Sequence, residues 1–391
     1  MFDYSKPRIQ PEFMVGDRMS PDPEGRKYLK VFDVRSTNEP GWDTECRRRL
    51  RYGVDNALIL EDFSLAVHQQ YVDDYGPIRI GDPPIRTGGG LSLPRNRPCV
   101  VAGYDESVIA VVLPRLVNGP SLANLTEASF SYAKVEARAI PKSYRGRAVP
   151  SRHSTDIKRY DMGIWLSKHL GFWHATGREV SDTFGPTRDT TGSSTNHQWG
   201  SRIQFIHAMQ PLDHRVDYIT WLARPDFYEG LRAARPLYRL NPAFTPFDQV
   251  WHSSYHGRAL LVNQQSGEHI DTKGVRRAWD VLVAAGEFEG GEIYLVDSDI
   301  HIPFMPGDMV AFDGTSQRHE IRPFNGKLRI SHVYFVHRSV LDELDVPMKL
   351  EDLYLCNLRE RLARFVPNGP GGRPPPPYQS TPPVASPVLG K

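Results

Sequence analysis

The chain has 391 residues, enough for one large domain or two of ordinary size. Its 48 Lys and Arg residues nearly balance its 46 Asp and Glu residues. The resulting net charge of +2 gives no sign of a dedicated nucleic-acid-binding domain, although it leaves room for a local basic groove. Three widely spaced cysteines, Cys46, Cys99 and Cys356, argue against a disulfide scaffold and against a zinc–cysteine site.

Residues 1–18 carry charges and prolines but lack the apolar core of a secretory signal. No segment approaches the roughly 18–20 apolar residues that a membrane span requires. The sequence therefore predicts an intracellular protein, in the nucleus or the cytoplasm, with no membrane partner.

Residues 1–240 are predicted to form an N-terminal α/β extension that packs on the core and adds strands to its sheet. Within it, residues 55–75 have apolar positions at mixed helical spacing and are the first helix candidate. Two apolar runs, 99–103 and 108–113, predict a hairpin of buried strands. Residues 157–174 are predicted as a helix, because their apolar side chains fall mostly on one side, and residues 216–234 as a pair of helices.

Two basic segments in this extension have alternative interpretations. One is 47–51, and the other, 142–159, contains Lys142, Arg145, Arg147, Arg152, Lys158 and Arg159. Both are consistent with solvated surface, and both with contacts to the phosphate backbone of a nucleic acid.

Residues 241–366 are predicted to form the core. Short apolar runs, broken by Gly, Pro and Asp about every ten residues, are typical of an antiparallel sandwich or barrel. The predicted fold class is α+β, with a double-stranded β-helix (a jelly-roll or cupin-like core) and flanking helices. Residues 348–365 are predicted as an amphipathic helix that packs on this core.

Residues 367–391 are rich in Pro and Gly, have few core-forming side chains, and are predicted to be disordered. Pro375, Pro376, Pro377 and Tyr378 resemble a WW-domain ligand. Such proline motifs also arise by chance in tails of this composition.

The predicted core contains a set of residues that suits a metal ion. His269 and Asp271 are two positions apart, so in extended backbone both side chains face the same way. His319 follows just before another predicted strand. Two histidines and one carboxylate on one face of an ion leave the other face open, which suits ferrous iron. His301, His332 and His337 are competitors for the second histidine, and spacing favours His319.

Arg329, ten positions after His319, begins a predicted strand. Its guanidinium suits a bidentate pair with the distal carboxylate of 2-oxoglutarate, and Ser331 points the same way. Asn263 and Gln264 are candidates either for contacts to 2-oxoglutarate or substrate, or for a turn. Val333 and Phe335 are candidates either for the pocket lining or for core packing.

Residues 267–337 also resemble the oxygenase domain of the TET/JBP type, particularly its fungal branches. The segments that carry the resemblance are Gly267 to Asp271, Arg277 to Asp280, Gly286 to Glu292, Phe304 to Val310, His319 and Arg329. The resemblance implies an Fe(II)/2-oxoglutarate-dependent dioxygenase that consumes O2 and oxidises a substrate C–H bond.

The sequence leaves three hypotheses for the function, two of which concern the substrate of an enzyme. The first is the methyl group of a modified pyrimidine base in DNA or RNA, which the resemblance and the basic segments favour. The second is an amino acid or another small metabolite, which the near-neutral charge favours. The third is a non-catalytic scaffold that uses its proline-rich tail.

Overall fold

The computed structural model describes residues 41–136, 164–173, 184–191, 196–238, 240 and 242–364. Among these residues, no helix combines the length and the apolar composition of a membrane span. The predicted proline-rich tail and the basic segment 142–159 lie outside the described residues, so the predictions made for them stay predictions.

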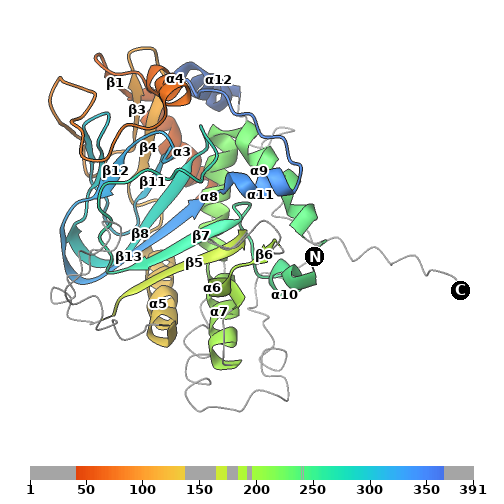
Figure 1. Ribbon diagram of the computed structural model, residues 1–391. Helices are drawn as coiled ribbons and strands as arrows, with labels where there is room; N and C mark the ends of the chain where they lie inside the picture. Colours follow the sequence, from red (N-terminus) through yellow and green to blue (C-terminus); the bar gives the residue numbers. More distant parts are fainter. Residues whose placement is uncertain are drawn as a thin grey trace, which may run out of the picture.

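Seven strands of the C-terminal part form two facing antiparallel sets (Figure 1). In the larger sheet, the neighbours in order are β11 (Met309–Phe312), β8 (Asp280–Gly290), β13 (Phe324–Phe335) and β7 (Gly257–Val262). In the smaller sheet, they are β12 (His319–Ile321), β9 (Ile293–Leu295) and β10 (Ile300–Ile302). An isolated bridge between His269 and His319 provides one more pairing position. This arrangement confirms the predicted α+β class with a jelly-roll core.

The N-terminal part extends both sheets. The edge next to β11 is continued by β4 (Val108–Leu113), β3 (Cys99–Gly103) and β1 (Leu58–Leu60), so the predicted hairpin is confirmed. At the other edge, β5 (Leu166–Trp173) pairs with β7 and is followed by β6 (Gly185–Pro186). The short β2 (Leu91–Ser92) pairs with β10 in the smaller sheet. Strand contributions from the first 240 residues are therefore confirmed.

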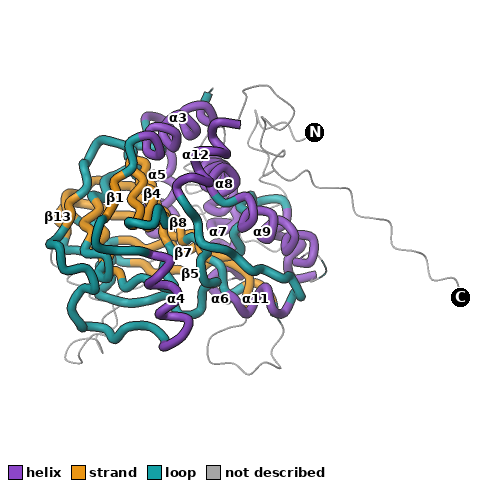
Figure 2. The backbone as a smooth tube through the Cα atoms, turned by 90° about the horizontal axis from the view of Figure 1, so that it is seen from above, coloured by secondary structure: helices purple, strands orange, loops and turns teal. Residues whose placement is uncertain are grey.

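Helices cover the face of the large sheet that lies away from the small sheet (Figures 1 and 2). They are α3 (Trp42–Asp55), α5 (Gly119–Glu136), α7 (Asn196–Ala208), α8 (Gln210–Ala223) and α9 (Pro225–Tyr238). The pair predicted within 216–234 is confirmed by α8 and α9. Shorter elements are α4 (Leu65–Tyr75), α6 (Arg188–Thr191), η4 (Pro242–Phe244), α10 (Thr245–Asp248), α11 (Arg338–Glu343) and α12 (Leu355–Arg364).

The large sheet separates two hydrophobic cores. In β8, Val281 and Val283 pack against the helices, whereas Leu282 and Ala284 pack toward the small sheet. This alternation follows from the two-residue period of a strand. The inter-sheet side is the one on which the proposed site lies, so every second residue of β5, β7, β8 and β13 can reach it.

The helix predicted for residues 157–174 is wrong over its described part. Residues 166–173 are strand β5, hydrogen-bonded to β7. Leu166, Leu170 and Phe172 are buried on the helix side, and these positions fit a period of two as well as a helical stripe. The alternate residues, His169 and Trp173, line a cavity on the other side.

Two other helices differ from prediction. Helix α3 was not predicted, because its many charged residues hide a buried stripe of Cys46, Leu50 and Val54 at helical spacing. Helix α12 begins at Leu355, later than the predicted 348, and its principal contacts are with α3 and α8. Of the predicted helix at 55–75, Asp55 ends α3 and residues 65–75 form α4, while β1 lies between these two helices.

Candidate metal centre and substrate cavity

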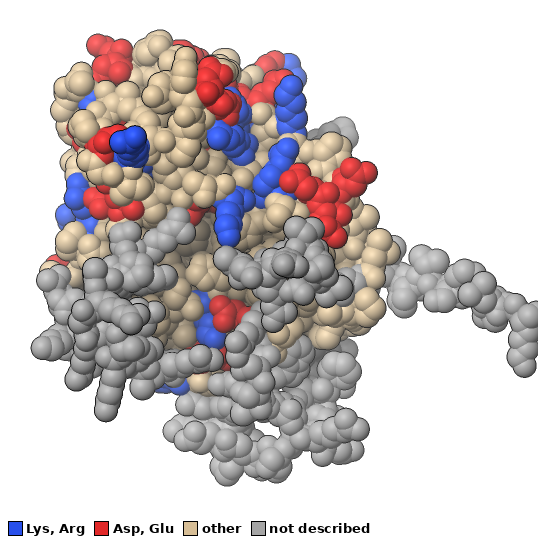
Figure 3. Space-filling model, viewed as in Figure 1, with Lys and Arg blue, Asp and Glu red and all other residues tan. Residues whose placement is uncertain are grey.

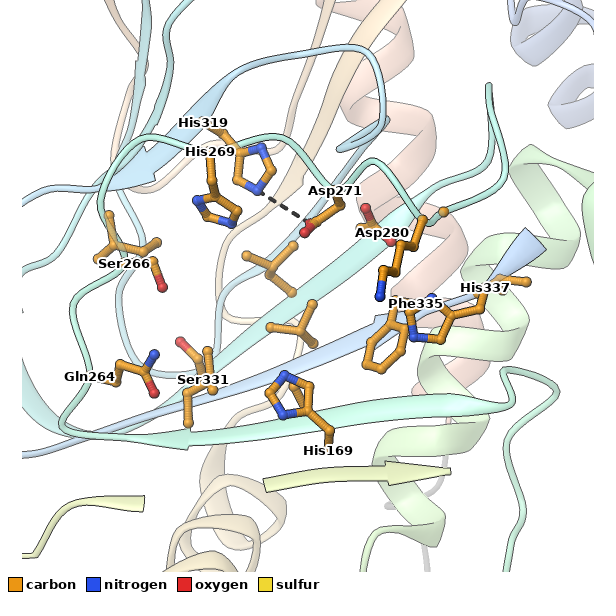
Figure 4. Close-up of a pocket in the computed structure, with 18 of the residues that line it drawn as sticks. His169, Gln264, Ser266, His269, Asp271, Asp280, His319, Ser331, Phe335 and His337 are labelled. Atoms are coloured by element: carbon orange, nitrogen blue, oxygen red, sulfur yellow. Dashed lines mark ion pairs between the residues drawn. The ribbon is translucent and has the colours of Figure 1, made fainter. Parts of the chain in front are cut away.

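The three predicted metal ligands come together at one end of a cavity (Figure 4). Backbone hydrogen bonds join His269 and His319 in both directions, at 3.0 and 2.9 Å. The Asp271 amide donates to Gly314 O at 2.9 Å, which fixes the third ligand. One ligand atom from each side chain lies within 4.8 Å of the others, and His319 Nε2 is 3.6 Å from Asp271 Oδ2.

In both histidines, the ring nitrogen Nδ1 lies within hydrogen-bond distance of a backbone carbonyl oxygen. His269 Nδ1 is 2.7 Å from Gly267 O, and His319 Nδ1 is 3.0 Å from Gln317 O. Since a carbonyl oxygen only accepts hydrogen bonds, Nδ1 carries the proton in each ring. The lone pair is then left on Nε2, the tautomer that a metal ion requires.

The competing histidines lie elsewhere. His301 stacks on Tyr294 in the small sheet, with ring centres 4.4 Å apart. His332 faces the helices, where its ring is fully buried beside Ser129. His337 lies across the cavity, next to Phe335 (Figure 4). Within the described part of the chain, His269, Asp271 and His319 are the group with converging ligand atoms.

Arg329 lies at the end of the cavity that also holds Gln264 and Ser331. It is 1% exposed, and its guanidinium carbon is 4.8, 5.4 and 5.7 Å from the ring centres of Phe324, Phe288 and Phe304. Three aromatic rings around a buried guanidinium attract its positive charge, and its planar fork is suited to pair with a carboxylate.

Gly291 and Asn263 position the Arg329 side chain at this end of the cavity. A Cβ on Gly291, whose φ is +69°, would lie 2.9 Å from Arg329 Nε, so only glycine leaves room for the guanidinium. Asn263 accepts a hydrogen bond from the Arg329 amide at 2.7 Å and donates to Ile164 O at 2.9 Å. The Asn263 side chain is thus used to hold the strands, as a turn residue would be, and it does not line the cavity.

Ser331 and Gln264 both line the cavity, as Figure 4 shows. Ser331 is 2% exposed, and its hydroxyl has no hydrogen-bond partner among the described residues. A buried hydroxyl in that state is costly unless a ligand or an ordered water satisfies it. Gln264 O also accepts a hydrogen bond from Arg329 Nη1 at 3.3 Å.

Asp280, which sequence reasoning did not identify, lies behind Asp271. Burial raises its pKa well above the usual range, and the nearby carboxylates Asp271 and Asp313 add to the shift. A cation bound at Asp271 would oppose this effect. A Cβ at Gly314 would collide with Asp280 Oδ2, so a larger residue there would displace the Asp280 carboxyl group.

The opposite end of the cavity is aromatic. Trp173 lies 5.5 Å from Phe335 and 5.0 Å from His337, measured between ring centres, with the rings inclined by 60° and 66°. His169 adds a fourth ring, 6.3 Å from Phe335. These side chains are partly exposed, unlike those around Arg329. The whole cavity has a volume of about 600 Å³, which is within the usual range for a small-molecule site.

The remaining candidate residues lie on two different sides of the large sheet. Val333 and Phe335 line the cavity, as one of their two interpretations proposed. The basic residues 47–51 belong to α3, on the helix-covered face of the large sheet, where Arg48 and Arg49 pair with Glu45 and Arg51 pairs with Asp55. They are therefore on the other side of the sheet from the cavity. Figure 3 shows basic and acidic side chains interspersed on the face viewed.

No protein-family model and no curated protein matches the sequence. Among solved structures, the chain is similar to NgTET1 in complex with 5mC DNA, with 15% identity over 78% of this chain and 92% of that one and a TM-score of 0.45. It is also similar to a prolyl hydroxylase from Trichoplax adhaerens in complex with a hypoxia inducible factor peptide fragment, with 9% identity, coverage of 79% and 98%, and a TM-score of 0.34.

A third similar structure is that of a full-length Neurospora crassa protein in complex with alpha-KG, with 14% identity, coverage of 65% and 86%, and a TM-score of 0.28. The solved structures that the chain resembles thus include 2-oxoglutarate/Fe(II) oxygenases. Similarity at these TM-scores is too low to transfer an activity to this chain.

Proposed function

We propose that the protein is an Fe(II)/2-oxoglutarate-dependent dioxygenase. The observation that carries this proposal is one cavity in which two imidazoles and a carboxylate converge beside a buried arginine. Hard oxygen and borderline nitrogen donors on one face suit ferrous iron. His269, Asp271 and His319 would hold the metal.

The residues around Arg329 fit the co-substrate. Its guanidinium would pair with the distal carboxylate of 2-oxoglutarate, and the hydroxyl of Ser331 would donate to the same anion. Gln264 lines the same end of the cavity. When bound, iron and 2-oxoglutarate supply oxidative decarboxylation to succinate and CO2, with O2 as the oxidant, coupled to oxidation of a substrate C–H bond.

The aromatic end would hold the substrate. The ring centres of Trp173, Phe335 and His337 lie 5.0–5.5 Å from one another, with the rings inclined by 60–71°, so together they form an aromatic wall. Aromatic walls stack on planar rings, at roughly 1–3 kcal/mol per base where this has been measured. The substrate that we propose is therefore a planar ring, first of all a pyrimidine base whose methyl group is oxidised in the manner that the TET/JBP resemblance implies.

A second candidate is a free metabolite or amino acid. It is favoured by the position of the basic residues 47–51, which lie across the sheet from the cavity and cannot bind the phosphates of a nucleic acid held there. A base within a polymer would have to be flipped into the cavity, with flanking phosphates bound nearby.

The experiment is to load the protein with Fe(II) and 2-oxoglutarate under anaerobic conditions, admit O2, and measure succinate by mass spectrometry. Separate arms contain methylated DNA, methylated RNA, free methylated pyrimidines and a pool of amino acids. We expect succinate to rise in one arm and to be absent in His319→Ala. Succinate in the free-pyrimidine or amino-acid arm alone would select the second candidate. No succinate and no bound iron in the wild-type protein would overturn the enzyme proposal and favour the scaffold hypothesis.

A further inference from the structure

Behind the metal site, on the side away from the cavity, an ionic cluster joins the two segments that carry the histidines. Arg318 and Glu268 each precede one of these histidines, and neighbouring residues in extended backbone point to opposite faces. Arg318 is 0% exposed, and its Nη1 is 3.1 Å from Glu268 Oε1. The pair therefore connects the two histidine-bearing segments from behind.

Arg318 makes an unusually complete set of hydrogen bonds for a buried guanidinium. Its Nε donates to Asp297 Oδ1 at 2.8 Å, and its amide donates to Asp297 Oδ2 at 2.7 Å. The other donors reach carbonyl oxygens of a single N-terminal segment, those of Arg79, Asp82 and Pro83, at 2.9, 2.7 and 3.0 Å. The amide of Gly81 in that segment donates to Glu268 at 3.1 Å.

The position of the pair in the chain links it to the imidazoles. Each histidine ring is oriented by the carbonyl two residues before it, Gly267 O for His269 and Gln317 O for His319. Glu268 and Arg318 are the middle residues of these two tripeptides. Any rotation of either tripeptide that breaks the carbonyl–imidazole bond must also move Glu268 or Arg318.

We propose that Arg318 and Glu268 are positioning residues that hold His269 and His319 in the orientation required for metal binding, with segment 79–83 as their anchor. This inference rests on the proposed metal site. The pair acts through the backbone of the ligands and contacts neither the metal nor the substrate. Loss of either partner frees the tripeptides and weakens metal binding, while the sheets and their cores stay intact.

The chain offers a matched control. Arg224 is also buried, at 2% exposed, donates to the carbonyls of Arg277 and Glu351, and pairs with the partly exposed Asp226. This second cluster has the same chemistry, but neither of its charged residues adjoins a ligand. Arg224→Lys and Asp226→Asn therefore show how far disturbing a buried ion pair changes stability and Co(II) affinity when the pair does not adjoin a metal ligand.

The test is a titration of metal-free full-length protein with Co(II), followed by visible absorption, in parallel with thermal unfolding. The variants are Arg318→Lys, Glu268→Gln, the double variant and the two controls. We expect Kd for Co(II) to rise about 10–100-fold in both single variants, as for outer residues that orient metal ligands. Because the two residues act as one unit, the double variant should bind little worse than either single one.

The outcomes separate this inference from the function on which it rests. If wild type binds Co(II) and the Arg318 and Glu268 variants match it within about twofold, the positioning role is overturned. The same holds if the Arg224 and Asp226 controls lose as much affinity. Absence of Co(II) binding in wild type would instead overturn the metal site itself. Should Arg318→Lys fail to fold, Glu268→Gln decides alone, since Arg318 then keeps Asp297 as its counter-charge.

Discussion

The two ends of the cavity differ in how they are built. At the Arg329 end, the polar groups are almost fully buried, enclosed by phenylalanine rings and contributed by the jelly-roll strands. At the other end, the rings are partly exposed, and His169 and Trp173 come from β5, a strand of the N-terminal extension. On the proposed function, the difference corresponds to a preformed end for a constant co-substrate and a more open end for the substrate, to which the N-terminal extension contributes two of the four rings. Variants at each end should therefore have separate effects on metal, co-substrate and substrate binding.

The largest effect is expected at the metal. Asp271→Ala removes one of three ligands, so metal affinity should fall by more than the roughly 100-fold that loss of an outer-shell partner costs. The loss of metal affinity is measured as the iron content of the purified variant and as its rate of succinate formation. Asp189→Ala, which removes a carboxylate from the aromatic end, is the control and should retain iron. Equal loss of iron in both variants would show that the two ends are not separate.

The next effect concerns the co-substrate. Arg329→Met removes a buried cation that we expect to make two charge-assisted hydrogen bonds, each about 1.5–3 kcal/mol. KM for 2-oxoglutarate should rise by about 100-fold or more, with Arg329→Lys intermediate because its ammonium cannot bind in bidentate fashion. Steady-state kinetics of succinate formation measure this. An unchanged KM would remove Arg329 from the co-substrate site.

A smaller effect is expected at the aromatic end. Trp173→Ala and Phe335→Ala should each raise KM for the substrate about 5–100-fold, the range for loss of one stacking surface. KM for 2-oxoglutarate and the slow succinate formation without substrate should not change. If KM for 2-oxoglutarate rose in parallel, the division of the cavity into two ends would be wrong.

The last effect concerns stability instead of binding and contrasts the two faces of β13, where Ser331 lines the cavity and His332 faces the helices. Burial lowers the pKa of His332 to about 3. The unfolded chain, with a pKa near 6.5, binds more protons than the fold at mildly acidic pH. The contribution of His332 to the free energy of unfolding is therefore complete above about pH 6.5. It decreases as the pH falls, by roughly 3 kcal/mol at pH 4.

Other groups also titrate in this range, so the test uses a difference. Burial raises the pKa of Asp217 to about 7, which changes stability with pH in the opposite direction. Urea unfolding is measured for wild type and for His332→Gln at pH 7 and at pH 4.5. Because Asp217 and the other titrating groups are present in both proteins, their contribution cancels when the two changes in the free energy of unfolding are compared. The variant should lose less stability between the two pH values than wild type does. Equal losses would mean that His332 is not held neutral by burial.

Local sequence predicted the parts of the site that depend on short-range spacing. His269 and Asp271 share a face because extended backbone repeats every two residues, and Arg329 and Ser331 share one for the same reason. The short apolar runs predicted the core strands, because each run fills one buried strand between turns. Residues 166–173 were predicted incorrectly, because alternating apolar residues on a short strand also fit one side of a helix.

Trp173, His169 and Arg318 with its partner Asp297 carried no local signal, and Asp280 was noted only as the end of a segment that carries the family resemblance. They become neighbours of the metal ligands only after strands far apart in the chain pair with each other, as β5 does with β7. Arg318 and Asp297 look like ordinary surface charges in the sequence. Their burial depends on segment 79–83, whose carbonyl groups satisfy the guanidinium.

Local periodicity and residue chemistry were thus enough to predict the jelly-roll class and to select His269, Asp271, His319 and Arg329 as the candidate site residues. Tertiary structure alone decided which residues complete the cavity, which basic segment lies away from it, and which charges are buried behind the ligands. Those properties depend on long-range strand pairing and on desolvation, and neither is encoded in the spacing of neighbouring residues.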